Sequence, residues 1–176
     1  MWRASIGTWT PREMLPLHLC SQAVWLGGLM LLTRSQRLYD YVYYAALAGA
    51  SMALATPDAG PYGWPHYRFW QFFISHGLIV FAPLWMTFVE GHRPGRGSAL
   101  RASAVSAASG LALIPLNLRL GSNYMFTARK PDSASLLDKL PPWPRYLPFM
   151  GAAVLAVYAA LGAPWALTPG RRPAPR

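Results

Sequence analysis

Five long apolar segments, separated by connectors rich in Arg, Pro and Gly, constrain the fold of this chain more than any other feature. They cover residues 15–33, 38–56, 70–90, 99–120 and 146–167. A helix of about 20 residues crosses the ~30 Å hydrocarbon core of a bilayer. Backbone polar groups find no water there, so spanning segments of this kind are expected to be α-helices. The sequence predicts an all-α fold: a polytopic membrane bundle of about five transmembrane helices, forming a single transmembrane domain over 1–176 with a polar tail at 168–176.

Composition and charge indicate the same class of protein. Hydrophobic residues make up 53% of the chain and charged residues 12%, against roughly 25% charged in an ordinary soluble domain. Sixteen Lys and Arg against six Asp and Glu give a net charge of +10. These basic residues lie between the apolar segments and form no continuous face, so they argue against nucleic acid as a partner. Membrane lipids are the expected partner.

The short connectors predict how the chain is oriented. Cytoplasmic loops carry an excess of Lys and Arg, and short loops count most. The connectors at 34–37 and 91–97 are short and rich in Arg. We therefore expect a multi-pass protein of the cell membrane, the inner membrane in a bacterium, with both connectors and the C-terminus in the cytoplasm.

Two polar residues within the apolar segments are candidates for chemistry. Cys20 lies near the start of the first segment and His76 in the early part of the third. Alternate segments run in the same direction, which puts both residues about 7–9 Å below one membrane surface at the helical rise. A thiol beside an imidazole is the minimum pair for nucleophilic acyl chemistry. The alternative is structural, since a lone membrane cysteine packs as a small hydrophobe and a lone histidine often bridges helices.

The connection at 121–145 contains more apolar residues than a solvated loop requires. Tyr, Met and Phe at 124–126 stand beside Asn123, Arg129 and Lys130. One interpretation is an amphipathic segment in the membrane interface. The other is a lid over Cys20 and His76, with Arg129 and Lys130 binding an anionic lipid headgroup. In this second interpretation, Asn123 is a candidate donor to an oxyanion.

The remaining polar residues suggest no further chemistry. His92 lies in the breaker-rich turn at 91–97 and is expected to face water, while Asp40 and Glu90 are expected in the membrane interface. Neither HExxH nor paired CxxC spacing is present, so no metal site is predicted, and no motif indicates a cofactor.

Several blocks taken together resemble the YwaF-like family of bacterial integral membrane proteins, which includes eukaryotic transmembrane protein 164. The blocks are LPLHLC (15–20), TPD (56–58), RFWQFFISHGLIV (68–80), TFVEG (87–91), GSNYMFTARKP (121–131) and SLLDKLPPWPRY (135–146). The resemblance implies a multi-span helical bundle with two further helices before LPLHLC, so the chain is expected to lack its N-terminal spans. A second copy or another helix is then an expected partner in their place.

The resemblance also implies an activity. The eukaryotic relative suggests acyl transfer onto lipids by a Cys and a His, which correspond here to Cys20 in LPLHLC and His76 in SHG. His18 also falls in a family block and is a candidate supporting residue. Two functions stay open at this point: a Cys/His-dependent lipid acyltransferase, and a non-catalytic membrane assembly component or small transporter.

Overall fold

A computed structural model of the chain describes residues 5–57, 62–132 and 135–166. Its α-helices are α2 (Leu19–Thr33), α3 (Gln36–Ala55), α4 (Tyr67–Phe88), α5 (Ser98–Leu120) and α6 (Tyr146–Ala166). Two 3-10 turns, η1 (Tyr124–Phe126) and η2 (Leu136–Lys139), lie between α5 and α6. The described ranges contain no strand. The predicted all-α membrane bundle is confirmed, and the predicted tail at 168–176 lies outside the described residues.

The helix boundaries lie within three residues of the predicted segments, except at the start of α2. The prediction began at residue 15, whereas the helix begins at Leu19, after an extended His18 with φ −68° and ψ 151°. Pro16 disfavours a helical conformation at Leu15. The Leu15 N–H also donates to the Tyr124 hydroxyl, 2.9 Å away. A contact from a distant part of the chain therefore holds this segment out of the helix.

Three of the helices, α4, α5 and α6, are long and apolar enough to cross a membrane. The α2 helix is apolar but has 15 residues, about 22 Å at the helical rise. The α3 helix has 20 residues, and its mean hydropathy is lower than that of α4 and α6. Membrane crossing by α2 and α3 stays a prediction.

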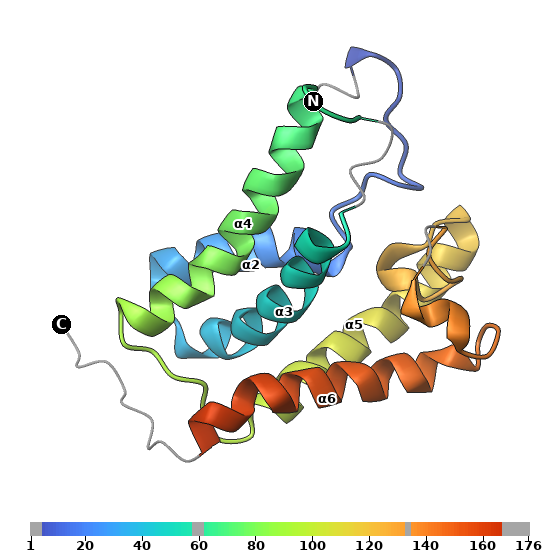
Figure 1. The fold of residues 1–176 in the computed structure, drawn as a ribbon. Coiled ribbons are helices and arrows are strands. Elements are labelled where there is room, and N and C mark those ends of the chain that lie inside the picture. The colour runs from blue at the N-terminus through green and yellow to red at the C-terminus, as the bar shows by residue number, and fades with distance from the viewer. Residues whose placement is uncertain (1–4, 58–61, 133–134, 167–176) are drawn as a thin grey trace.

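The α3 helix occupies the centre of the bundle. It packs against α2 and α4 on one side and against α5 and α6 on the other (Figure 1). Its buried tyrosines are hydrogen-bonded to neighbouring helices: Tyr39 to Thr87 of α4 at 2.7 Å and Tyr44 to Ser98 of α5 at 2.9 Å. Polar groups away from water require such partners. Because its neighbours cover it, α3 can be more polar than a helix that faces lipid.

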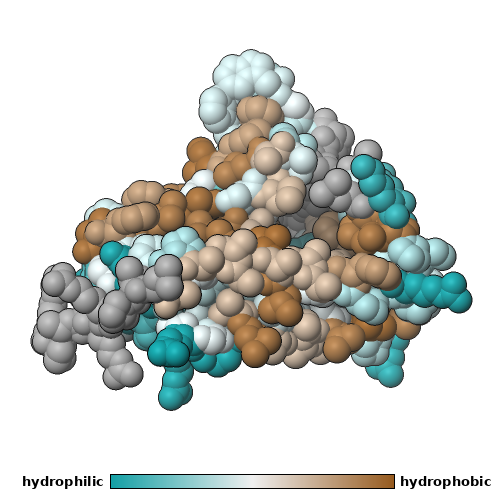
Figure 2. Space-filling model, turned by 60° about the horizontal axis from the view of Figure 1, so that its bottom comes forward, coloured by the Kyte–Doolittle hydropathy of each residue, from teal (hydrophilic) through white to brown (hydrophobic). Residues whose placement is uncertain are grey.

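The outer face of the bundle is apolar along the helices. Figure 2 shows hydrophobic residues along the flank of the molecule, with hydrophilic residues concentrated towards its ends. Large apolar side chains point outwards, among them Leu32 at 85% exposure and Phe88 at 71%. A soluble protein rarely exposes so much continuous apolar surface. A bilayer is the solvent that this surface fits.

Polar contacts join the connectors at the end of the bundle where α2 and α4 finish. Arg34 pairs with Glu90 at 3.3 Å, and Asp40 pairs with Arg101 at 3.2 Å. The prediction that His92 faces water is wrong, because its side chain is 2% exposed. Its Nε2 lies 3.1 Å from the carbonyl oxygen of Arg34. This hydrogen bond draws the ring inwards, between the two connectors.

Candidate functional site

Cys20 lies in the first turn of α2, partly buried against the bundle core. Its sulfur faces Gly49 of α3, where an added Cβ would lie 3.7 Å from Sγ. The absence of a side chain at Gly49 leaves room for the first turn of α2 to approach α3. The thiol therefore lies against the backbone of α3 at Gly49.

His76 lies in the first half of α4 and is partly buried. Its Nδ1 is 2.8 Å from the carbonyl oxygen of Phe72, one turn earlier, and the Phe72 ring packs on the imidazole with centroids 4.3 Å apart. A carbonyl oxygen can only accept, so Nδ1 carries the proton of the neutral ring. The lone pair is then on Nε2, which makes Nε2 the basic atom.

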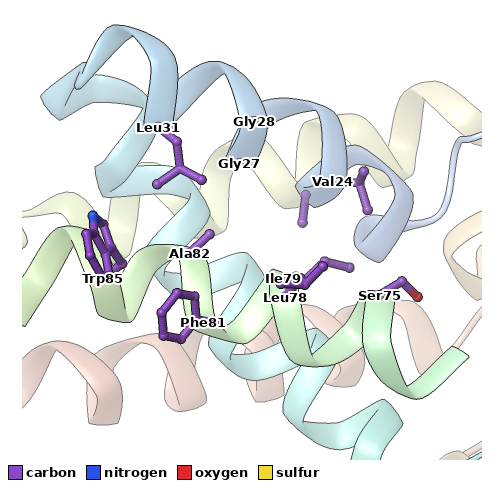
Figure 3. A pocket seen from close by; sticks show the side chains of 11 residues that line it. Val24, Gly27, Gly28, Leu31, Ser75, Leu78, Ile79, Phe81, Ala82 and Trp85 are labelled. Atoms are coloured by element: carbon purple, nitrogen blue, oxygen red, sulfur yellow. The ribbon is translucent and has the colours of Figure 1, made fainter. Parts of the chain in front are cut away.

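Cys20 and His76 lie on helices that pack together and run in the same direction. Figure 3 shows Val24 near Ser75 at one end of this contact and Leu31 near Trp85 at the other. Cys20 is one turn before Val24, and His76 directly follows Ser75. The two residues therefore lie towards the same end of the bundle.

No hydrogen bond, ion pair or ring contact among the described residues joins Cys20 to His76. The first half of α4 extends away from the other helices (Figure 1). Catalytic hydrogen bonds are often long in a structure without substrate and tighten when it binds. His76 and Cys20 thus place a base and a thiol on adjacent helices without a direct contact between them.

His18 contacts the connection between α5 and α6 directly. The Met125 N–H donates to His18 Nδ1 at 3.4 Å, and the His18 ring lies 5.2 Å from that of Tyr124. Gln22 adds a contact from its Nε2 to the Met125 sulfur at 3.7 Å. Because His18 Nδ1 accepts a hydrogen bond, Nε2 carries the proton in the neutral ring. His18 is therefore a donor at Nε2, the opposite arrangement to that of His76.

The predicted site residues of the connection mainly shape the connection itself. Asn123 Oδ1 accepts from the N–H groups of Ala128 at 3.3 Å and Arg129 at 3.0 Å, and its Nδ2 donates to the carbonyl of Lys130. The Lys130 ammonium donates to the Leu140 carbonyl at 2.6 Å. Arg129 is 46% exposed and lies 3.8 Å from Asp132. Of these residues, Arg129 offers the most accessible positive charge.

Asn117, at the end of α5, organises this connection and was not among the predicted site residues. Its side chain is buried and makes hydrogen bonds to Ser122, to Thr127 and to both the N–H and the carbonyl of Tyr124. These contacts hold Met125 at φ 56° and Phe126 at φ 54°, a conformation that is uncommon for residues other than glycine. An asparagine one turn before the terminating Gly121 was the available signal in the sequence.

A groove of about 550 Å³ runs between α2 and α4 (Figure 3). It extends from Val24 and Ser75 to Leu31 and Trp85. Its α2 wall contains Gly27 and Gly28, so part of that wall is bare backbone. The groove thus begins next to His76 and one turn beyond Cys20.

Comparison with known proteins identifies the family. No curated protein and no solved structure matches the chain. The profile of the TMEM164 family matches residues 1–161, and the membrane bundle described above is the architecture expected from the family resemblance. This integral membrane protein belongs to the TMEM164 family.

Proposed function

We propose that the protein transfers acyl groups between membrane lipids, with Cys20 as the nucleophile and His76 as the general base. The orientation of His76 is the observation that carries the proposal. Its Nδ1–H donates to the Phe72 carbonyl, so the free lone pair of the ring is on Nε2. His76 lies on α4, and Cys20 lies on the neighbouring helix α2. A base oriented by a third group is the usual arrangement for activating a nucleophile.

The first half-reaction forms an acyl-enzyme. His76 Nε2 takes the proton from the Cys20 thiol, and the thiolate attacks the ester carbonyl of a donor lipid. The tetrahedral intermediate collapses with cleavage of the ester C–O bond, and the leaving alkoxide takes the proton back from His76. The products are a Cys20 thioester and a lysolipid.

The second half-reaction reverses the roles of these groups. The hydroxyl of an acceptor lipid gives its proton to His76 Nε2 and attacks the thioester carbonyl. The C–S bond breaks, and the Cys20 sulfur regains the proton from His76. One acyl group has moved, and no oxidant, reductant or nucleotide is consumed.

The connection at 121–131 contributes the lid and the charge in this proposal. It packs on His18, two residues before Cys20. The Arg129 guanidinium, half-exposed beside Asp132, would exchange this ion pair for a lipid phosphate. Lys130 adds a second positive charge from the same segment. His18 Nε2–H is a better candidate than Asn123 for donating to an oxyanion, because the Asn123 amide is engaged within its own loop.

Reconstituted protein tests the proposal directly. Vesicles would contain a phospholipid with a labelled acyl chain and an unlabelled lysophospholipid, and label appearing on the acceptor is measured. Cys20→Ser and His76→Ala should each abolish transfer, whereas Ser21→Ala on the same turn of α2 should retain it. A hydroxylamine-sensitive acyl group on Cys20 is expected by mass spectrometry.

The alternative function makes the opposite prediction in the same assay. If Cys20 and His76 only pack helices together, Cys20→Ser leaves lipid composition and any cellular phenotype unchanged. Undiminished transfer by Cys20→Ser would refute the proposed nucleophile. Absence of transfer by the parent protein, together with unchanged lipids in cells lacking it, would favour a non-catalytic role.

We also propose that the connectors at 34–37 and 91–97, and the C-terminus, lie in the cytoplasm of a bacterial cell. The exposed Arg96 lies in the second connector. In a Cys20→Ser background, Arg96→Cys should resist a membrane-impermeant thiol reagent in intact cells and react after the cells are opened. Reaction in intact cells contradicts this orientation.

A further inference from the structure

We infer that the groove between α2 and α4 binds a single lipid acyl chain along its length, and that its far end selects for chain length. The assignment of this acyl chain to the acyl donor rests on the function proposed above. The binding of an acyl chain in the groove is independent of that function.

The chemistry of the groove walls fits a hydrocarbon and excludes a polar ligand. Among the described lining residues, the polar side-chain groups are the Ser75 hydroxyl at one end and the Trp85 indole N–H at the other. The Ser75 hydroxyl already donates to the Phe72 carbonyl at 3.0 Å. Between these ends the walls are carbon and bare helix backbone, where burying a charged or hydrogen-bonding group costs several kcal/mol.

Two glycines leave the α2 wall of the groove without side chains. An added Cβ at Gly28 would meet nothing within 4 Å, and one at Gly27 would meet only Val42 Cγ1, at 3.9 Å. The two helices nevertheless contact each other directly. A further helix needs an axis 8–10 Å from its neighbours, so it cannot enter between two helices that are already in contact. A flexible chain one carbon wide can.

The length of the groove matches one acyl chain of a bilayer lipid. From Ser75 to Trp85 the helix advances ten residues, about 15 Å at the helical rise. This is half of the ~30 Å hydrocarbon core, which is the depth filled by the chains of one leaflet.

The position of the groove links it to the candidate residues. Its entrance at Val24 and Ser75 lies one turn beyond Cys20 and directly beside His76. A lipid whose ester carbonyl is at Cys20 can therefore lay its chain along the groove towards Leu31 and Trp85. In that position the side chains at the far end meet the chain terminus and limit its length.

Photocrosslinking tests chain binding without requiring turnover. The Cys20→Ser protein would be placed in vesicles of phosphatidylcholine carrying a diazirine near the end of one acyl chain. Crosslinks should be enriched on α2 and α4 peptides over the lipid-facing α6. Gly28→Leu fills the groove and should remove this enrichment, whereas Leu32→Phe, at a side chain 85% exposed on the same helix, should keep it.

Chain-length selectivity tests the assignment to the donor. In the active protein, Gly28→Leu should shift preference to shorter donor chains, with a loss of about fourfold in kcat/KM for each methylene displaced from the groove. Leu32→Phe should leave the preference unchanged. Equal losses for all chain lengths would overturn the assignment of the groove to the donor chain.

The two proposals fail in distinguishable ways. Enriched crosslinks that Gly28→Leu removes, in a protein without transferase activity, would keep the groove inference and reject the acyltransferase. Crosslinks spread equally over α2, α4 and α6, or unaffected by Gly28→Leu, would overturn the groove inference.

Discussion

Replacing Asn117 by alanine should open the connection between α5 and α6. The side chain is 1% exposed, and its four hydrogen bonds reach Ser122, Thr127 and both backbone groups of Tyr124. Each such bond contributes about 0.5–1.5 kcal/mol net. The loss of all four therefore destabilises the folded connection by about 2–6 kcal/mol. At the lower end of this range, the open form becomes about 30 times more populated.

Limited trypsin digestion in detergent micelles measures this opening at a single bond. The Arg129–Lys130 bond lies in the connection, and cleavage follows the population of the open form when opening is fast. Cleavage there should accelerate at least about 30-fold in Asn117→Ala. Ser122→Ala removes one of the four bonds and should accelerate it only about 2- to 13-fold. If Asn117→Ala is cleaved no faster than Ser122→Ala, Asn117 does not hold the connection closed.

Three further substitutions test the packing of the bundle by thermal unfolding in detergent. Gly162→Ala places a Cβ 2.9 Å from the buried Tyr44 hydroxyl, and this close contact should cost about 1–3 kcal/mol. Gly151→Ala on the same helix meets nothing within 4 Å and should keep or raise the melting temperature, because alanine favours a helix over glycine. Equal effects of the two substitutions would contradict the packing of α6. Tyr39→Phe removes the bond to Thr87 and should cost about 1 kcal/mol; no change would show that this buried bond contributes nothing. Arg101→Ala breaks an ion pair whose arginine is 62% exposed and should cost less than about 1 kcal/mol, so a larger loss would indicate a structural role for that pair.

The positions of the helices were predictable because the bilayer fixes both their length and their composition. The α5 helix (Ser98–Leu120) begins and ends within one residue of its predicted segment. The common end of the bundle that holds Cys20 and His76 followed from the alternating direction of the segments. Both conclusions need only local composition and the order of elements along the chain.

Contacts between distant parts of the chain were not predictable in the same way. The extended residues before α2 depend on the Tyr124 hydroxyl, more than a hundred positions later. His92 lies in a polar, breaker-rich turn, yet the Arg34 carbonyl draws it into the interior. The separation between Cys20 and His76 depends on how α2 and α4 diverge, which neither helix encodes alone.

The central position of α3 has a consequence for how the chain enters the membrane. Arg37 and Asp40 lie within its first turns, and its four tyrosines at 39, 41, 43 and 44 follow directly. Charged residues oppose insertion of an isolated helix by a few kcal/mol each near its centre and less near its ends. The Tyr39 hydroxyl finds its partners at Thr87 and the His92 carbonyl, and the Tyr44 hydroxyl at Ser98. All three partners are synthesised after α3. If α3 crosses the membrane, its insertion should therefore be coupled to the arrival of α4 and α5. We then expect biogenesis to be cooperative across these three helices and not to proceed one span at a time.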